Sequence, residues 1–321
     1  EVMEKSGIDL KSITEFFHGT TTIINALTER KGAKTGLITT KGFRDILELA
    51  RGNRPDLFNM GFEKPEPFVP RYLRREVEER MAYNGEVVVP LNKDDIKAAV
   101  DYFRKEGVEA IAVCYINSYA NEAHERETAE IVRELWPEVY VSPSVDITRE
   151  WREYERTSTA VLNAYVMPAA SSYIDRLDGR LSEAGVEGSR YIMQSNGGTT
   201  TFEQSKITPV NVVESGPVAG VFGASILGKF IGEKNIIAFD VGGTTAKCSL
   251  IDDGEVKVTT SYFIEKDERN AGYPIMAPVV DIVEIGNGGG YEKTCDGQGN
   301  SRLLHCLAKL RSKHQSCIVK A

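Results

Sequence analysis

The sequence predicts a mixed α/β fold with two domains. The chain has 321 residues, and single domains are usually shorter. Between residues 85 and 141 two strand–helix–strand passages follow one another, which favours a parallel or mixed sheet covered by helices. Residues 236–260 form a different unit, in which a strand, a glycine turn, a second strand, a tighter turn and a third strand follow in order.

The elements of the first half follow from apolar spacing and from turn residues. The polar turn 18–22, His-Gly-Thr-Thr-Thr, opens a helix over 23–31; its free N–H groups could hold an anion, and a threonine N-cap explains the same residues. Asn92 caps a helix that runs to Glu106, since apolar residues recur there at spacings of three and four. Strands are expected at 35–40, 85–90, 110–116 and 139–141, and further helices at 46–50 and 121–135.

Several polar residues of this half lead to local predictions. Residues 71–79 carry both charge signs at high density, which predicts a solvated strand or helix face. His124 is expected to be exposed on its helix, whereas Cys114 is expected in the core. Arg51 and Arg54 flank a Gly-Asn turn and could clamp a carboxylate or a phosphate; a solvated surface loop fits them equally.

A long helix that starts at Trp151 and ends before Gly185 is expected to contain the domain hinge. Pro168 lies inside it, and proline kinks or interrupts a helix. A strand follows at 191–193, and then a helix over 218–230 that Ser215 could cap. No Gly-x-Ser-x-Gly motif is present around the serine after the 191–193 strand, so a serine hydrolase is not expected.

Residues 239–251, Phe-Asp-Val-Gly-Gly-Thr-Thr-Ala-Lys-Cys-Ser-Leu-Ile, carry the most specific chemistry. The apolar run 236–239 predicts a buried strand, and Asp240 lies at its end. A carboxylate in that position can meet a hydrated Mg²⁺ or orient a water molecule. The turn that follows leads into another strand, which distinguishes it from phosphate loops and dinucleotide motifs that lead into a helix.

The turn after Asp240 is a candidate nucleotide site. Gly242 and Gly243 have no Cβ, so backbone N–H groups can approach an anion closely there. Thr244 and Thr245 add hydroxyl donors. A nucleotide phosphate and an ordinary Gly-Gly hairpin both fit these residues.

A second glycine-rich run follows the strand predicted at 279–285. Its glycines include Gly286, Gly288 and Gly289, which makes it a second candidate for nucleotide contact. A flexible loop explains the same composition. A nucleotide contact therefore stays one of two interpretations for each glycine run.

Composition excludes several functions. The net charge of −8 argues against a general nucleic-acid binder, which needs a basic face. No apolar run approaches the length that spans a membrane. The five cysteines have no paired metal-ligand spacing, so a reduced cytoplasmic protein is expected.

The character of the chain changes after Gly290. Residues 291–321 contain three of the cysteines and have no clear apolar period. Their cysteines and histidines fit no standard zinc spacing, so a foreign, poorly packed tail is the expectation. The chain also starts without an initiator methionine, so we expect it to be incomplete.

Taken together, these motifs resemble the hydantoinase A / 5-oxoprolinase family, which includes ATP-dependent ketone carboxylase subunits. The motifs that carry the resemblance run in the family's order and lie at 18–21, 25–32, 39–45, 53–55, 195–198, 214–217, 240–245 and 281–290. The resemblance implies the fold of the actin / sugar-kinase / Hsp70 ATPases, in which two α/β lobes enclose ATP and Mg²⁺. It also implies that the family's first phosphate hairpin lies upstream of Glu1.

The resemblance divides the chain into three parts and suggests roles for the site residues. The expected parts are a hydantoinase/oxoprolinase N-terminal region at 1–165, the first part of the following domain at 166–290, and the atypical tail 291–321. Asp240 is expected to be the catalytic residue and the Mg²⁺ ligand. The cofactor-binding residues are expected to be Gly242, Gly243, Thr244, Thr245, Gly286, Gly288 and Gly289.

The activity that the resemblance implies is ATP-dependent hydrolysis of a cyclic amide such as a hydantoin or 5-oxoproline. Phosphoryl transfer to the carbonyl oxygen would activate the amide. A companion hydantoinase B-type subunit is expected, and no nucleic-acid or membrane partner. A ketone carboxylase subunit and a non-catalytic ATP-binding module are the alternatives.

Overall fold

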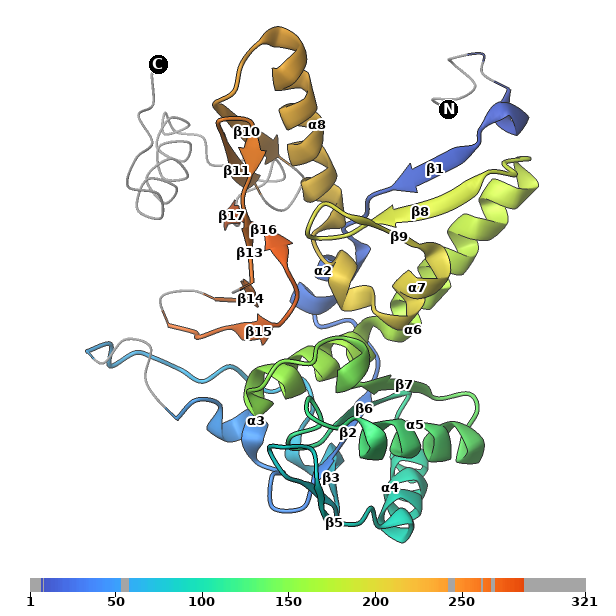
Figure 1. Cartoon of the computed structure of the whole chain (residues 1–321), viewed down its shortest axis with the longest axis vertical. Helices are drawn as coiled ribbons and strands as arrows, with labels where there is room; N and C mark the ends of the chain where they lie inside the picture. The colour runs from blue at the N-terminus through green and yellow to red at the C-terminus, as the bar shows by residue number, and fades with distance from the viewer. Residues whose placement is uncertain are drawn as a thin grey trace.

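The computed structural model describes Gly7 and residues 9–52, 58–241, 246–260, 262–266 and 269–285 (Figure 1). Some of the predicted site residues lie outside these ranges. They are Gly242, Gly243, Thr244, Thr245, Gly286, Gly288, Gly289 and Arg54, together with the tail 291–321.

A four-stranded parallel sheet of order β3-β2-β6-β7 organises the first core. Its strands are β2 (Thr35–Thr40), β3 (Arg74–Val77), β6 (Ala110–Cys114) and β7 (Tyr140–Pro143). Every residue of β2 and β6 is buried, so both faces of the sheet are covered. The helices packed around it are α3 (Ile46–Leu49), α4 (Lys93–Lys105), α5 (Ala123–Leu135) and the first half of α6 (Glu153–Glu183).

The predicted strand–helix–strand passages are confirmed in part. The second passage is β6–α5–β7, as expected. In the first, the strand that enters the sheet before α4 is β3; residues 87–89 instead form β5 (Val87–Val89), paired with β4 (Arg80–Met81) in a separate hairpin. The side chain of Asn92 accepts the N–H groups of Asp94 and Asp95, so the predicted cap of α4 is correct.

Two predictions about polar residues in this region are wrong. Residues 74–77 are not a solvated face but strand β3, in which Arg74 is fully buried. His124 is only 6% exposed, because its Nδ1 lies 2.8 Å from the carboxylate of Glu79, which is itself buried. In both cases a polar partner inside the fold compensates for burial, and charge density in the sequence does not reveal it.

Helix α6 connects two cores. Ala160, Val161 and Ala164 pack in the first core, whereas Val166 and Ile174 pack in the second. The helix continues through Pro168, so the proline does not interrupt it. The kink that was predicted as the alternative stays a prediction. Buried side chains on both sides of the proline keep the helix in place although one backbone hydrogen bond is lost.

The second core surrounds a three-stranded sheet of order β1-β8-β9. β1 (Glu15–His18) runs parallel to β8 (Ser189–Met193), and β9 (Thr199–Thr201) is antiparallel to β8. The helices α2 (Thr22–Thr28) and α7 (Phe202–Ile207) and the second half of α6 contribute to the same core. The carboxyl ends of β1 and β8 therefore lie side by side (Figure 1).

The third region is an antiparallel sheet against helix α8 (Ser215–Ile231). The strands β10 (Ile236–Val241), β11 (Ala246–Asp252) and β12 (Glu255–Val256) follow one another, and β17 (Ile282–Ile285) pairs with β11. The predicted antiparallel order of the strands is confirmed, but the third strand is shorter than expected, because residues 258–259 leave it and pair with residues 279–280. The first predicted turn, 242–245, lies outside the described residues. Small strand pairs complete the region: β13 (Val258–Thr259) with β16 (Val279–Val280), and β14 (Tyr262–Ile264) with β15 (Tyr273–Ile275).

The prediction that β10 is buried is wrong. Ile237 is 39% and Phe239 is 46% exposed. The reason is position, because within the described residues β10 pairs with β11 alone and forms a sheet edge. Among all the residues that the structure describes, no helix is both long enough and apolar enough to cross a membrane.

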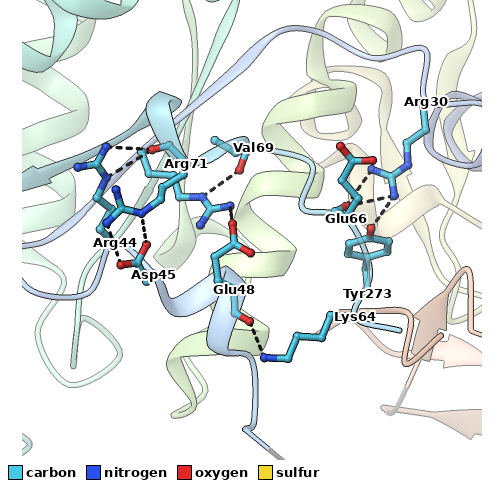
Figure 2. A network of polar contacts seen from close by, with 10 residues as sticks. Arg30, Arg44, Asp45, Glu48, Lys64, Glu66, Val69, Arg71 and Tyr273 are labelled. Atoms are coloured by element: carbon cyan, nitrogen blue, oxygen red, sulfur yellow. Dashed lines mark hydrogen bonds and ion pairs between the residues drawn. The ribbon is translucent and has the colours of Figure 1, made fainter. Parts of the chain in front are cut away.

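Arg30 ties the third region to the rest of the molecule (Figure 2). Its guanidinium lies 3.7 Å from the ring centre of Phe68 and donates to the hydroxyl of Tyr273 over 2.6 Å. It also forms an ion pair with Glu265 at 2.9 Å. These contacts join the turn after α2 to β15 and to the loop before β3.

Candidate functional site

Two motifs that lie 195 residues apart in the sequence meet where α8 begins. The N–H of Thr20 donates to Oγ of Ser215 over 3.0 Å, and the Ser215 hydroxyl donates to the carbonyl oxygen of Thr20 over 2.9 Å. The approach is close, because a Cβ on Gly19 would lie 3.0 Å from the carbonyl oxygen of Ser215. Ser215 lies inside the first turn of α8 and joins it to β1, so its predicted capping role is wrong.

Ser195, at the carboxyl end of β8, brings a third motif to this point. Its side chain is fully buried, and its Oγ accepts the N–H of Glu214 over 3.1 Å. Its carbonyl oxygen accepts the N–H of Val280 over 2.8 Å. Contacts near the start of α8 therefore join four stretches that the sequence singled out separately: 18–21, 195–198, 214–217 and 279–285. This point lies at the carboxyl ends of the parallel strands β1 and β8, where ligand sites of α/β folds usually lie.

Glu214 forms a buried ion pair in the same place. Lys247 Nζ donates to its Oε2 over 2.7 Å, and the Tyr262 hydroxyl donates to its Oε1 over 2.6 Å. The side chains of Glu214 and Lys247 are 1% and 7% exposed. Both carboxylate oxygens thus have a donor, which offsets much of the cost of removing two charges from water.

Asp240 lies opposite Lys247 in the antiparallel pairing of β10 and β11. Residues directly opposite in such a pair place their side chains on the same face of the sheet. The Asp240 carboxylate is exposed, and it comes two residues before the turn 242–245. The structure therefore brings together the predicted catalytic residue and a cation that the sequence analysis did not single out.

Both side chains line a pocket of about 250 Å³ between α8 and the sheet. The other lining residues are Pro217, Gly220, Val221, Ala224, Ala238, Phe239, Cys248, Ser249 and Ile282. Space is available beside the helix, since a Cβ on Gly220 would meet no atom within 4 Å. The pocket thus has a mostly apolar wall and charged groups at one place, which suits an organic ligand that carries a polar group.

The described residues fit a Mg²⁺–nucleotide complex better than a metal bound by protein alone. Among them, no group of three or more histidine, cysteine, aspartate or glutamate side chains is close enough to hold a metal ion. Magnesium in nucleotide sites is bound by one or two carboxylates, with phosphate oxygens and water completing the shell. Asp240 is an exposed carboxylate of the kind that such sites use.

The sequence analysis missed Glu214 as a partner, and it missed Lys247 and Tyr262 altogether. One signal was available: Lys247 interrupts a strand whose neighbours are apolar or small, and a buried lysine requires a partner. Arg51, for which an anion clamp and a solvated loop were both open, donates to the carboxylate of Glu155 over 2.6 Å. The seven predicted glycine and threonine contacts fall outside the described residues.

Two family models match the chain. Residues 1–136 match the hydantoinase/oxoprolinase N-terminal region, and residues 156–307 match the hydantoinase/oxoprolinase model. Together they account for most of the sequence. The predicted boundary at residue 165 stays a prediction.

Curated relatives are similar over most of this chain but are much longer. An uncharacterised protein of Methanocaldococcus jannaschii is 36% identical over 90% of this chain and 44% of its own length. The caprolactamase alpha subunit of Pseudomonas jessenii is 34% identical over 85% of this chain and 39% of that subunit. The chain thus spans about two fifths of these relatives.

Solved structures agree with the fold. A nucleotide-free acetone carboxylase, from work on ATP-dependent acetone carboxylation, superposes with a TM-score of 0.79 at 27% identity, over 89% of this chain and 41% of that one. The ATP-dependent caprolactamase of P. jessenii gives 0.78 at 31% identity, over 92% and 43%. The expected α/β, ATPase-like fold is confirmed, and the chain belongs to the hydantoinase/oxoprolinase family.

Proposed function

We propose that the protein containing this chain hydrolyses a cyclic amide, of the hydantoin or 5-oxoproline type, in an ATP-dependent reaction. The observation that carries the proposal is the position of Asp240, an exposed carboxylate at a strand end beside Lys247 and a pocket. Residues 242–245, which follow it, have the composition of a phosphate-binding turn. A relative that acts on a lactam, the caprolactamase, supports the substrate class.

The chemistry explains why ATP would be needed. An amide carbonyl is a poor electrophile, and nitrogen is a poor leaving group. Transfer of the γ-phosphoryl group to the amide oxygen releases ADP and produces an activated imidate-type carbon. Water then adds to that carbon, and the ring C–N bond opens as the nitrogen takes a proton, which leaves an acyl phosphate. A second water hydrolyses the acyl phosphate to the carboxylate and inorganic phosphate. The protein's contribution is positioning and charge stabilisation.

In this proposal the chain supplies one side of the nucleotide site. Asp240 would hold hydrated Mg²⁺, which when bound neutralises charge on the transferred phosphoryl group. The residues Gly242, Gly243, Thr244, Thr245, Gly286, Gly288 and Gly289 would contact the nucleotide. Glu214 holds Lys247 in place, so its cation stays on the same face of the sheet as Asp240. A cytoplasmic location and a hydantoinase B-type companion remain predictions.

A ketone carboxylase subunit is the second candidate, and one observation favours it. The acetone carboxylase structure superposes as well as the caprolactamase structure, with TM-scores of 0.79 and 0.78. Both reactions begin with phosphoryl transfer to an oxygen, so the same site could serve either. The substrate test is therefore ATP hydrolysis by the full-length protein with its partner subunit. We expect stimulation by a hydantoin, 5-oxoproline or a lactam without bicarbonate.

The outcomes of that test separate three functions. Turnover that needs both a ketone and bicarbonate would assign the carboxylase reaction. Nucleotide binding with no stimulation by any of these compounds would leave a non-catalytic ATP-binding module.

The site itself is tested by Asp240→Asn in the full-length protein, which keeps the shape and removes the charge. Turnover should fall by about 10²–10³-fold, the effect of losing one well-placed electrostatic group. ATP affinity should change much less, because backbone N–H groups would still bind the phosphates. Both are measured on the same preparation, with the melting temperature as a check of folding.

Asp252→Asn is the matched control. Asp252 also ends a strand of this sheet and is exposed, but it lies at the other end of β11 and pairs with Lys257 at 3.5 Å. Turnover of this variant should be unchanged. Normal turnover of Asp240→Asn together with a lowered melting temperature would remove the catalytic role of Asp240.

A further inference from the structure

A second pocket, far from Asp240 in the sequence, is lined mainly by cations. It has a volume of about 220 Å³ and lies beside β3, the edge strand of the parallel sheet. Its lining residues are Lys41, Arg44, Arg74, Arg75, Glu76 and Asp95. They come from the loop after β2, from β3 and from the first turn of α4. With four cations and two carboxylates, the lining has a formal charge of +2.

The two lining carboxylates are already used by backbone groups. Glu76 accepts the N–H of Gly42 over 2.7 Å, and Asp95 accepts the N–H of Glu78 over 2.9 Å. Gly42 has a φ of +91°, so the loop turns back in a conformation that favours glycine. The acids therefore hold the loop after β2 and the chain at the end of β3 in place, and no ion pair joins them to the arginines of the pocket.

Two of the arginines have no carboxylate partner within the described chain. Arg44 donates only to the carbonyl oxygen of Arg71, over 3.2 and 3.4 Å (Figure 2). Arg75 stacks over the ring of Tyr102 at 4.5 Å, and no described acid forms an ion pair with it. A guanidinium held in place but not neutralised is preorganised for an anion.

Arg74 lines the pocket but is not accessible from it. Its side chain is fully buried, and burial lowers the pKa of its guanidinium. Nε donates to the Val69 carbonyl oxygen over 2.9 Å and Nη2 to Glu48 over 2.9 Å. An anion in the pocket would therefore contact Arg44 and Arg75.

From these observations we propose that this pocket binds a small dianion, a phosphate group or a dicarboxylate, between Arg44 and Arg75. Lys41 already pairs with Glu78 at 3.2 Å and Arg74 with Glu48 at 2.9 Å, so a charge of −2 matches the two guanidinium groups that no described carboxylate neutralises. The site belongs to the parallel sheet and is separate from the nucleotide site proposed above, so it does not depend on that proposal.

Isothermal titration of the chain with inorganic phosphate and with malonate, at constant ionic strength set by chloride, tests the proposal. We expect saturable binding of at least one of the two, and the tighter one identifies the ligand class. Arg44→Gln/Arg75→Gln should weaken it by tenfold or more, since each removes a charge-assisted contact. Lys41→Gln, on an exposed residue, should weaken it by a smaller factor.

Arg176→Gln/Arg180→Gln is the matched control. Both residues are exposed on α6, and Arg176, like Arg44, donates to a backbone carbonyl. This variant should bind like the wild type. Absence of saturable binding of either anion, or equal weakening by the control pair, would overturn the proposal. Circular dichroism of each variant excludes misfolding as the cause, and the Lys41→Gln result stands if the arginine pair does not fold.

Discussion

The parallel sheet of the first core and the antiparallel sheet beside α8 are enclosed to very different degrees. In the parallel sheet every residue of β2 and β6 is buried between helices. In the antiparallel sheet β10 is half exposed, and the outer face of α8 exposes Phe230 and Ile231 at 84% and 64%. The candidate nucleotide site lies on the less enclosed sheet.

The difference shows how each sheet is stabilised. The parallel sheet has a large apolar core, whereas the antiparallel sheet has a small one and is also held by buried polar contacts. Glu214, Lys247 and Tyr262 form one group of these contacts. Removing apolar groups should therefore affect the first sheet most, and breaking one polar pair should affect the second.

The largest effect is expected for Phe103→Ala in α4. Phe103 is fully buried, and its ring lies so close to β2 that a Cβ on Gly36 would come within 2.8 Å of it. The substitution should lower the free energy of unfolding by about 3–5 kcal/mol. The same change at the half-exposed Phe239 should cost less than about 1 kcal/mol. Urea unfolding of both variants compares the sheets directly, and equal losses would contradict the contrast.

The second largest loss of stability is expected for Lys247→Met. It leaves the Glu214 carboxylate buried without its cation, which should cost about 3 kcal/mol. Adding Glu214→Gln should recover much of that loss, because the uncompensated charge is then gone. Lys257→Met, which breaks an exposed pair at 3.5 Å, serves as the control and should cost less than about 1 kcal/mol. If the single and double variants at the buried pair are equally stable, charge is not the cause.

The smallest effect concerns pH. Burial lowers the pKa of His18, whose Nε2 lies 2.7 Å from the Tyr173 hydroxyl at the end of β1. Because the folded pKa is below the unfolded value of about 6.5, the contribution of His18 to stability is present above that pH and is lost as the pH falls below it. The wild type should therefore lose slightly more stability than His18→Gln between pH 7.5 and 5. Parallel pH dependences in urea unfolding would show that His18 does not titrate with folding.

Local patterns in the sequence determined most of the elements. The cap at Asn92, the strand over 35–40 and the three-stranded unit after α8 depend on neighbouring residues, so they were predictable from spacing and turn chemistry. The position of Asp240 before a glycine turn was also visible in the sequence. The family followed from motifs in a fixed order.

Only the tertiary structure decided which polar side chains are buried and which residues they pair with. Arg74 and His124 are buried although their neighbours in sequence are charged, because Glu48 and Glu79 reach them from other elements. Lys247 next to Asp240 is held by Glu214, which lies 33 residues away. β10 is exposed because, among the strands that the structure describes, it pairs with β11 alone and forms an edge of its sheet. Local sequence cannot fix such properties, since the cost of burying a charge depends on a partner that only the folded chain brings near.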